Sequence, residues 1–253
     1  MSMEMYRWEQ LPWETIERKV FKLQKRIYRA SQRGDVKTVH RLQKLLMKSW
    51  SAKCLAVRRV TQDNQGKKTA GVDGVKSLTP PQRLMLVRGL KLVPRTRPVR
   101  RVWIPKPGTQ EKRGLGIPTM YERALQGLVK LALEPEWEAK FEPNSYGFRP
   151  GRSCHDAMMA IWTDINKMGK DVLDADIAKC FDRINHEALL KKLSTFPTLR
   201  QVIKAWLKAG VMEGTTLFPT EEGTPQGGPI SPLLANIAGR LFGRIGTVAS
   251  MRP

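Results

Sequence analysis

The sequence has few cysteines, no long apolar run and no apolar leader. Its three cysteines, Cys54, Cys154 and Cys180, lie far apart in the 253 residues and form no C-x-x-C pair. That usage argues against a disulfide framework and a zinc site, and it indicates a reducing compartment. No run of eighteen apolar residues occurs, so we expect no membrane span. The stretch from Met1 to Trp13 carries charges and a proline, which argues against a signal peptide.

Acidic residues are also scarce, and the scarcity is confined to one half of the chain. The sequence has 45 Lys and Arg against 23 Asp and Glu, for a formal net charge of +22. Residues 1–113 contain 28 basic and 8 acidic residues, whereas residues 114–253 contain 17 and 15. Because the excess lies in helix-like segments and not in a detachable tail, it predicts a polyanion-binding face. We expect nucleic acid as the partner in preference to an anionic membrane.

The N-terminal region is predicted to be helical. The apolar residues Ile16, Val20, Leu23 and Ile27 recur at helical spacing, with basic residues on the other faces. The pair Gly34-Asp35 indicates the end of one helix and the N-cap of the next. Residues 63–74 are rich in glycine and polar residues, so we expect a loop there.

After residue 92 the pattern changes to mixed strands and helices. Ser153 is expected to cap a helix, with Asp156 at the third helical position. The other predicted elements are strands at 99–105, 115–119 and 171–176, helices at 121–133, 185–194 and 198–209, and a hairpin within 215–223.

Two segments carry candidate chemistry. Asp174 and Asp176 alternate on the predicted strand, so their carboxylates point the same way, toward a site where a hard cation could bind. About forty residues later, Gly223-Thr-Pro-Gln-Gly-Gly228 places bare backbone and one amide side chain on a tight turn. Together they predict half of a magnesium-dependent nucleotidyl-transfer site. The spacing of Asp174 and Asp176 alone also fits a metal-binding glycosyltransferase, which the basic half of the chain disfavours.

Several motifs in order resemble the reverse transcriptases encoded by bacterial and organellar group II introns. The N-terminal part is similar to the helical extension of that family, and the remainder to its polymerase part. The motifs are Leu23-Gln-Lys-Arg-Ile-Tyr-Arg-Ala30, Ala56-Val-Arg-Arg-Val-Thr61, Thr69-Ala-Gly-Val-Asp-Gly74, Ile104-Pro-Lys-Pro107, Arg113-Gly-Leu-Gly-Ile-Pro118, Tyr146-Gly-Phe-Arg-Pro-Gly-Arg-Ser153, the Asp176 strand and Gly223 to Asn236.

The resemblance implies an α/β (α+β) fold in three parts. Residues 1–92 are expected to be a basic, RNA-binding helical extension, and residues 93–238 the fingers and partial palm of an incomplete right-hand polymerase. Residues 239–253 form a divergent tail without assignment. The implied activity is RNA-directed DNA polymerisation with Mg²⁺, an RNA template, a primer and deoxynucleoside triphosphates. The implied location is the bacterial cytoplasm or an organelle.

The resemblance also implies roles for individual residues. Asp176 matches the first catalytic, metal-binding aspartate, and the carbonyl of Ile177 completes part of that coordination. Asp174 is not required by the family, and we expect it to be a solvent-exposed carboxylate. Phe181 matches the aromatic ring that selects deoxyribose, with a core position as the alternative, and Asp182 is expected to cap the next helix. The remaining nucleotide-binding positions are Lys106, Arg113, Gln226 and Gly227.

The expected RNA contacts are basic residues from three regions. They are Lys22, Lys25, Arg26, Arg29, Arg58, Arg59, Arg149 and Arg152. For Arg149 and Arg152, the sequence leaves open whether the side chain contacts the template or holds its own loop.

One departure from the family bears on activity. The family next has a hairpin with two aspartates, whereas residues 239–253 contain no acidic residue. We therefore expect a truncated reverse transcriptase that binds RNA and is inactive by itself, whose Asp176 strand lacks a neighbour. Two alternatives stay open. One is a splicing-assisting, maturase-like RNA-binding fragment. The other is one half of a split enzyme, completed by a complementary polymerase fragment. The unpartnered strand also favours pairing with another copy of the chain.

Overall fold

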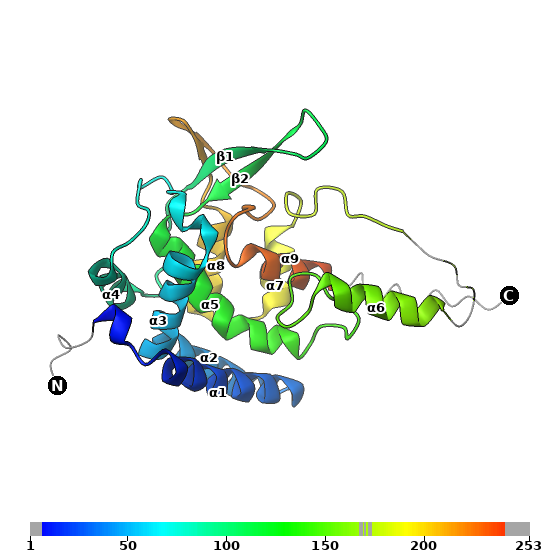
Figure 1. The fold of residues 1–253 in the computed structure, drawn as a ribbon, viewed down its shortest axis with the longest axis horizontal. Helices are drawn as coiled ribbons and strands as arrows, with labels where there is room; N and C mark the ends of the chain where they lie inside the picture. The colour runs from blue at the N-terminus through cyan, green and yellow to red at the C-terminus, as the bar shows by residue number, and fades with distance from the viewer. Residues whose placement is uncertain (1–6, 167–168, 170, 172–173, 241–253) are drawn as a thin grey trace.

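The computed structural model describes residues 7–166, 169, 171 and 174–240 (Figure 1). After a 3-10 turn at Trp8–Gln10, three helices form the N-terminal part: α1 (Trp13–Gln32), α2 (Val36–Lys48) and α3 (Trp50–Arg58). The predicted stop and cap between α1 and α2 are confirmed. Gly34 has a φ of +70°, and the Asp35 side chain accepts a hydrogen bond of 3.0 Å from the backbone N–H of Thr38.

A small sheet lies on one side of the helices (Figure 1). Its strands are β1 (Val99–Pro105), β2 (Lys112–Ile117), β3 (Val211–Glu213) and β4 (Thr216–Phe218), in the spatial order β2-β1-β3-β4. The pairs β1–β2 and β3–β4 are antiparallel, and β1–β3 is parallel. The predicted strand at 99–105 is thus found. The hairpin predicted within 215–223 lies instead at Val211–Phe218, because residues 219–223 form no strand.

A short π-helix at Arg59–Asp63 follows α3. Six further α-helices lie in the described part of the chain, and the predicted ones lie within a few residues of their expected bounds. Ser153 caps α6 as expected, with its backbone N–H donating to Asp156 at 2.7 Å. The helices are α4 (Pro80–Gly89), α5 (Met120–Glu138), α6 (Cys154–Ile165), α7 (His186–Leu193), α8 (Pro197–Leu207) and α9 (Ser231–Gly239).

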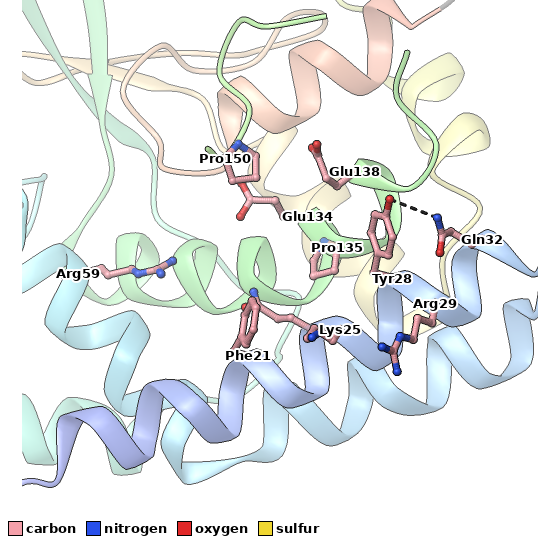
Figure 2. A pocket seen from close by; sticks show the side chains of 11 residues that line it. Phe21, Lys25, Tyr28, Arg29, Gln32, Arg59, Glu134, Pro135, Glu138 and Pro150 are labelled. Atoms are coloured by element: carbon pink, nitrogen blue, oxygen red, sulfur yellow. Dashed lines mark hydrogen bonds between the residues drawn. The ribbon is translucent and has the colours of Figure 1, made fainter. Parts of the chain in front are cut away.

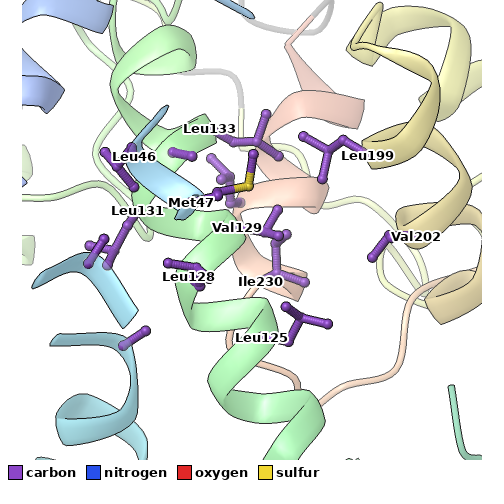
Figure 3. Close-up of a cluster of buried hydrophobic side chains, with 14 of the residues drawn as sticks. Leu46, Met47, Leu125, Leu128, Val129, Leu131, Leu133, Leu199, Val202 and Ile230 are labelled. Atoms are coloured by element: carbon purple, nitrogen blue, oxygen red, sulfur yellow. The ribbon is translucent and has the colours of Figure 1, made fainter. Parts of the chain in front are cut away.

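Helix α5 is the centre of the hydrophobic core. Its side chains Leu125, Leu128 and Val129 are at most 1% exposed. Figure 3 shows Met47 of α2 and Leu199 of α8 in one buried cluster with the side chains of α5. The N-terminal helices and the later elements therefore share one core, so the predicted division at residue 92 does not separate two independent cores.

Helix α5 continues five residues beyond its predicted end because α1 compensates for a proline inside it. Pro135 has no N–H, so the carbonyl of Leu131 loses the donor that a helix normally supplies four residues later. Gln24 of α1 donates to that carbonyl at 2.9 Å. Seven residues farther along α1, Ser31 donates to the carbonyl of Glu136, also at 2.9 Å. These two bonds fasten α1 to α5.

Replacing Gln24 with alanine is expected to lower the free energy of unfolding by about 1–3 kcal/mol, because the carbonyl of Leu131 then has no donor. Urea denaturation measures the loss. The matched control is Gln32→Ala on the exposed side of α1, which should change stability by at most about 0.5 kcal/mol. Pro135→Ala restores a helical N–H, so it should suppress most of the Gln24→Ala effect. An undiminished Gln24→Ala effect in that background would contradict this account.

Two predictions near the acidic segment are wrong. Asp171 and Asp174–Ile177 do not form a strand, and residues 172–173 lie outside the described residues. A strand exists only when its backbone groups pair with a neighbour, and no described segment pairs with this one. Asp182 does not cap the next helix either. Asn185 does so, accepting from the N–H of Ala188 at 2.9 Å.

Candidate functional site

The glycine-rich turn after Gly223 crosses the middle of β2. The N–H of Gly116 donates to the carbonyl of Gln226 at 2.7 Å. Gly227 has a φ of +128°, and a Cβ at this position would lie 2.7 Å from the oxygen of Gly116. Only glycine permits this close backbone approach, so the sequence of the turn is set by its contact with β2.

The same turn is anchored to the segment that follows Asp176. The N–H of Thr224 donates to the carbonyl of Phe181 at 2.7 Å, and that of Gly223 to the carbonyl of Ile184 at 2.8 Å. His186, the buried first residue of α7, lies with Nε2 2.7 Å from the carbonyl oxygen of Gly223. Since a carbonyl can only accept, Nε2 carries the hydrogen. His186 therefore positions the turn.

These contacts form a cavity of about 550 Å³, called here the central cavity. Four of the residues predicted to bind nucleotide line it together: Arg113 of β2, Phe181, Gln226 and Gly227. The fifth, Lys106, is not among the lining residues. It lies at the tip of the β1–β2 hairpin, where its ammonium pairs with Glu111 at 2.6 Å and lowers the pKa of that carboxyl.

The cavity also contains two residues that the sequence analysis missed. The ring of Phe148 meets the ring of Phe181 edge to face, with centroids 6.2 Å apart and an interplanar angle of 85°. Phe148 is 64% exposed and has a φ of +58°. The motif around Tyr146 was recognised, but nothing in the spacing of its residues indicated that this ring would face Phe181.

Arg123 is the other missed residue, and it orders one rim of the cavity. Its guanidinium is buried and donates to the carbonyls of Pro118 (2.9 Å), Gly66 (2.8 Å) and Thr69. Burial lowers the pKa of Arg123. The loop predicted at 63–74 is thus held in place, with a short 3-10 turn at Gln65–Lys68. Because α5 is buried on nearly all sides, periodicity gave no sign that an arginine would point into the site.

Asp176 lies outside the central cavity and is exposed. Its side chain accepts a hydrogen bond of 2.8 Å from the N–H of Ile177, and Asp174 is exposed as expected. Ile177 lines a separate, mostly apolar groove of about 640 Å³ beside α7 and α9. Within residues 7–166, 169, 171 and 174–240, no group of three or more His, Cys, Asp or Glu side chains could hold a metal.

The described donors therefore do not form a magnesium site. Mg²⁺ requires near-octahedral oxygen coordination, whereas one carboxylate at Asp176 and one carbonyl at Ile177 supply part of a ligand set at most. Gln226 lies 3.4 Å from a carboxylate oxygen of Asp182, which ties Asp182 to the turn.

The predicted RNA-binding residues divide into two groups. Lys22, Lys25, Arg26 and Arg29 on α1 are exposed, as is Arg59. The remaining three make contacts within the protein. Arg58 pairs with Glu17 (3.2 Å) and Asp63 (3.6 Å) and lies over the ring of Trp13. Arg152 donates to the carbonyl of Pro143 and lies over the ring of Tyr146.

Arg149 is the clearest case of an internal role. Its side chain is 3% exposed and pairs with Glu138 at 2.6 Å. It also donates to the carbonyls of Glu142 (2.5 Å) and Ser145 (2.8 Å). Of the two roles that the sequence left open, these contacts are those of a side chain that holds its loop, because no surface remains on it for an RNA contact.

Among the helices that the structure describes, none combines the length and apolar character needed to cross a membrane.

Two family comparisons cover most of the chain. Residues 8–90 match the N-terminal domain of reverse transcriptase. Residues 104–243 match the family described as reverse transcriptase (RNA-dependent DNA polymerase).

Three curated relatives agree with these matches. The group II intron-encoded protein LtrA of Lactococcus lactis subsp. cremoris is 41% identical over 143 residues, which is 55% of this chain and 24% of LtrA. Protein YkfC of Escherichia coli is 36% identical over 211 residues, 78% of this chain and 55% of YkfC. Maturase-like protein 1 of Euglena gracilis is 33% identical over 196 residues, 72% of this chain and 41% of that protein. The matched region thus spans between a quarter and about half of these relatives.

A solved structure shares the fold. A chain of the partial Cas6-RT-Cas1–Cas2 complex superposes with a TM-score of 0.50 at 23% identity, covering 81% of this chain and 35% of that one. The mixed helical and sheet architecture is therefore that of the polymerase fingers and palm.

Proposed function

This chain belongs to the reverse transcriptase (RNA-dependent DNA polymerase) family, in its group II intron-encoded, maturase-like type. On that premise, we propose that the 253-residue polypeptide is an RNA-binding polymerase unit that does not polymerise DNA by itself. RNA binding is assigned to the basic N-terminal half. The observation that carries this assignment is the row of exposed cations on α1, in a half of the chain with 28 basic and 8 acidic residues.

The central cavity is the proposed site for a deoxynucleoside triphosphate. Arg113 can bind phosphate oxygens bidentately, and the backbone of Gly227 leaves room for close approach. Phe181 presents its ring to the same space, edge to face with Phe148, which fits a role beneath the sugar.

Magnesium is the proposed ion, because the family generally uses divalent metals. Asp176 and Ile177 are the proposed partial ligand set. Since the described residues do not complete a site, catalysis requires additional acidic donors. With a complete set of ligands, such ions would supply positive charge to stabilise the transition state of phosphoryl transfer.

RNA binding is expected to depend steeply on salt and on the exposed cations of α1. Reversing Lys22, Lys25 and Arg26 to glutamate removes about three phosphate contacts. The slope of log K against log salt should therefore become shallower by about 2–3, and affinity should fall at least about tenfold at 0.1 M salt. Fluorescence anisotropy with a structured RNA at several salt concentrations measures both quantities.

The matched control reverses Arg183, Lys191 and Lys208, three exposed cations of the C-terminal half. It makes the same change in net charge, and its slope should change by less than about 1. Equal effects from the two triple variants would mean that binding follows net charge alone, and RNA binding that survives the α1 reversal would refute the assignment.

A second candidate function is one half of a split reverse transcriptase, and two apolar surfaces favour it. Helix α6 extends away from the other helices in Figure 1. Its side chains Met158, Met159, Ile161 and Trp162 are 59–65% exposed. The apolar groove beside α7 and α9 contains Ile177, next to the candidate metal ligand Asp176. Large exposed apolar areas of this kind mark protein interaction sites, and the proposed partner is a polypeptide that carries a two-aspartate hairpin.

A further inference from the structure

A groove of about 450 Å³ lies between α1 and α5, and it shares no lining residue with the central cavity. We call it the α1–α5 groove. Figure 2 shows Phe21, Lys25, Tyr28 and Arg29 along α1, facing Pro135 of α5, with Arg59 at one end. Aromatic rings and cations thus alternate along one wall.

The groove presents a net positive charge to a ligand, although two glutamates line it. Glu134 pairs with Lys130 at 3.5 Å, and Glu138 pairs with Arg149 at 2.6 Å. Both carboxylates are therefore neutralised from within the protein. The three cations of the groove, Lys25, Arg29 and Arg59, make no ion pair with any carboxylate in the described part of the chain. They are free to bind an anionic ligand.

The aromatic side chains are placed to contact flat groups. Phe21 is 58% exposed, which is unusual for a phenylalanine on a helix whose other face is buried. Tyr28 follows seven residues later on the same face, about 10 Å along the helix axis. The ammonium of Lys25 lies between them, 5.5 Å from the centroid of the Phe21 ring. A ligand with planar groups joined by phosphates matches this alternation.

The groove is preformed. Gln24 and Ser31 bind carbonyls of α5 at 2.9 Å each, so the two helices are fixed relative to each other. A ligand therefore meets the rings and cations already in position, and little conformational entropy is lost on binding.

We propose that the α1–α5 groove binds a single-stranded segment of RNA, with bases on Phe21 and Tyr28 and phosphates on Lys25, Arg29 and Arg59. This inference rests on the proposed RNA-binding function and adds the site and the strandedness of the ligand. Duplex RNA is disfavoured because its bases are stacked on each other and present no free face to a ring. An acidic peptide would satisfy the cations but would leave the exposed Phe21 ring without a partner.

The test compares Phe21→Leu with Phe21→Trp in the full 253-residue chain. The probes are a fluorescein-labelled oligouridylate of about twelve nucleotides and an RNA hairpin with the same number of phosphates. Loss of one base–ring stack should weaken oligouridylate binding by Phe21→Leu about 5- to 150-fold. Phe21→Trp should retain the affinity, and hairpin binding should change by less than about twofold in both variants. Phe218→Leu on β4, a phenylalanine that is 48% exposed, is the matched control.

Three results would overturn the inference, and they are distinguishable. If the unmodified chain binds neither RNA, the proposed RNA-binding function fails and the groove inference fails with it. If the chain binds both RNAs but Phe21→Leu binds oligouridylate as tightly as the unmodified chain, only the groove inference fails. If Phe21→Leu instead abolishes self-association in sedimentation while RNA binding is unchanged, the groove binds a second copy of the chain.

Discussion

The purified 253-residue chain is expected to show no primer extension with Mg²⁺, an RNA template and a DNA primer. Polymerisation of this kind needs two cations held between opposed carboxylates. The described residues contain no such cluster, and residues 239–253 contribute no acidic side chain. Losing one auxiliary electrostatic contact costs about 10²–10³ in rate, and losing the ligands of both ions should cost far more. Gel analysis of extended primers measures the outcome.

Addition of a second polypeptide tests whether this chain can take part in catalysis. A fragment of a relative that carries the two-aspartate hairpin should restore extension if this chain is one half of a split enzyme. Asp176→Asn in this chain should then abolish the restored activity while leaving RNA binding unchanged. Failure to restore activity at any ratio excludes the split-enzyme candidate. Extension by the isolated chain that disappears in Asp176→Asn would show that its own donors suffice, contrary to our proposal.

Arg149→Ala is expected to lower the free energy of unfolding by about 3–5 kcal/mol, the cost of breaking a buried ion pair by removing one partner. The substitution leaves Glu138 without its cation and the carbonyls of Glu142 and Ser145 without a donor. It also removes the guanidinium from above the ring of Phe141 (5.2 Å). Urea denaturation followed by circular dichroism measures the change.

The matched control for this prediction is Arg152→Ala, three residues away. Arg152 donates to one carbonyl and is more exposed than Arg149, so its loss should cost about 1 kcal/mol or less. Arg149→Lys should recover only part of the stability, because an ammonium cannot reproduce the planar fork of bonds. An Arg149→Ala variant with unchanged stability and weakened RNA binding would instead favour the template contact.

The family motifs include four residues that line the central cavity, but they do not show which contacts bring these residues together. The motifs predict nucleotide-binding roles for Arg113, Phe181, Gln226 and Gly227, and these four residues line one cavity. Their meeting depends on hydrogen bonds between segments about forty residues apart, such as that from Thr224 to Phe181. Phe148 and Arg123 were missed because their importance arises from what they face, which neither helical nor strand periodicity records.

The acidic segment shows the opposite error. Alternation of Asp174 and Asp176 predicted a strand, but alternation describes only which way side chains point if a strand forms. Whether it forms depends on a neighbouring strand that supplies backbone partners, and no described segment does so here. The alternation of residue types was therefore misleading about local structure.

The sequence alone determined the basic N-terminal half, the helix caps at Asp35 and Ser153, and the order of the family motifs. Each of these features depends only on residues that are close together along the chain. Tertiary packing decided which of those charged side chains are exposed and able to bind a ligand. It buried Arg149 against Glu138, paired Lys106 with Glu111, and left Lys25, Arg29 and Arg59 facing an open groove. The physical reason is that the role of a charged side chain depends on its partners in space, and those partners lie on other elements.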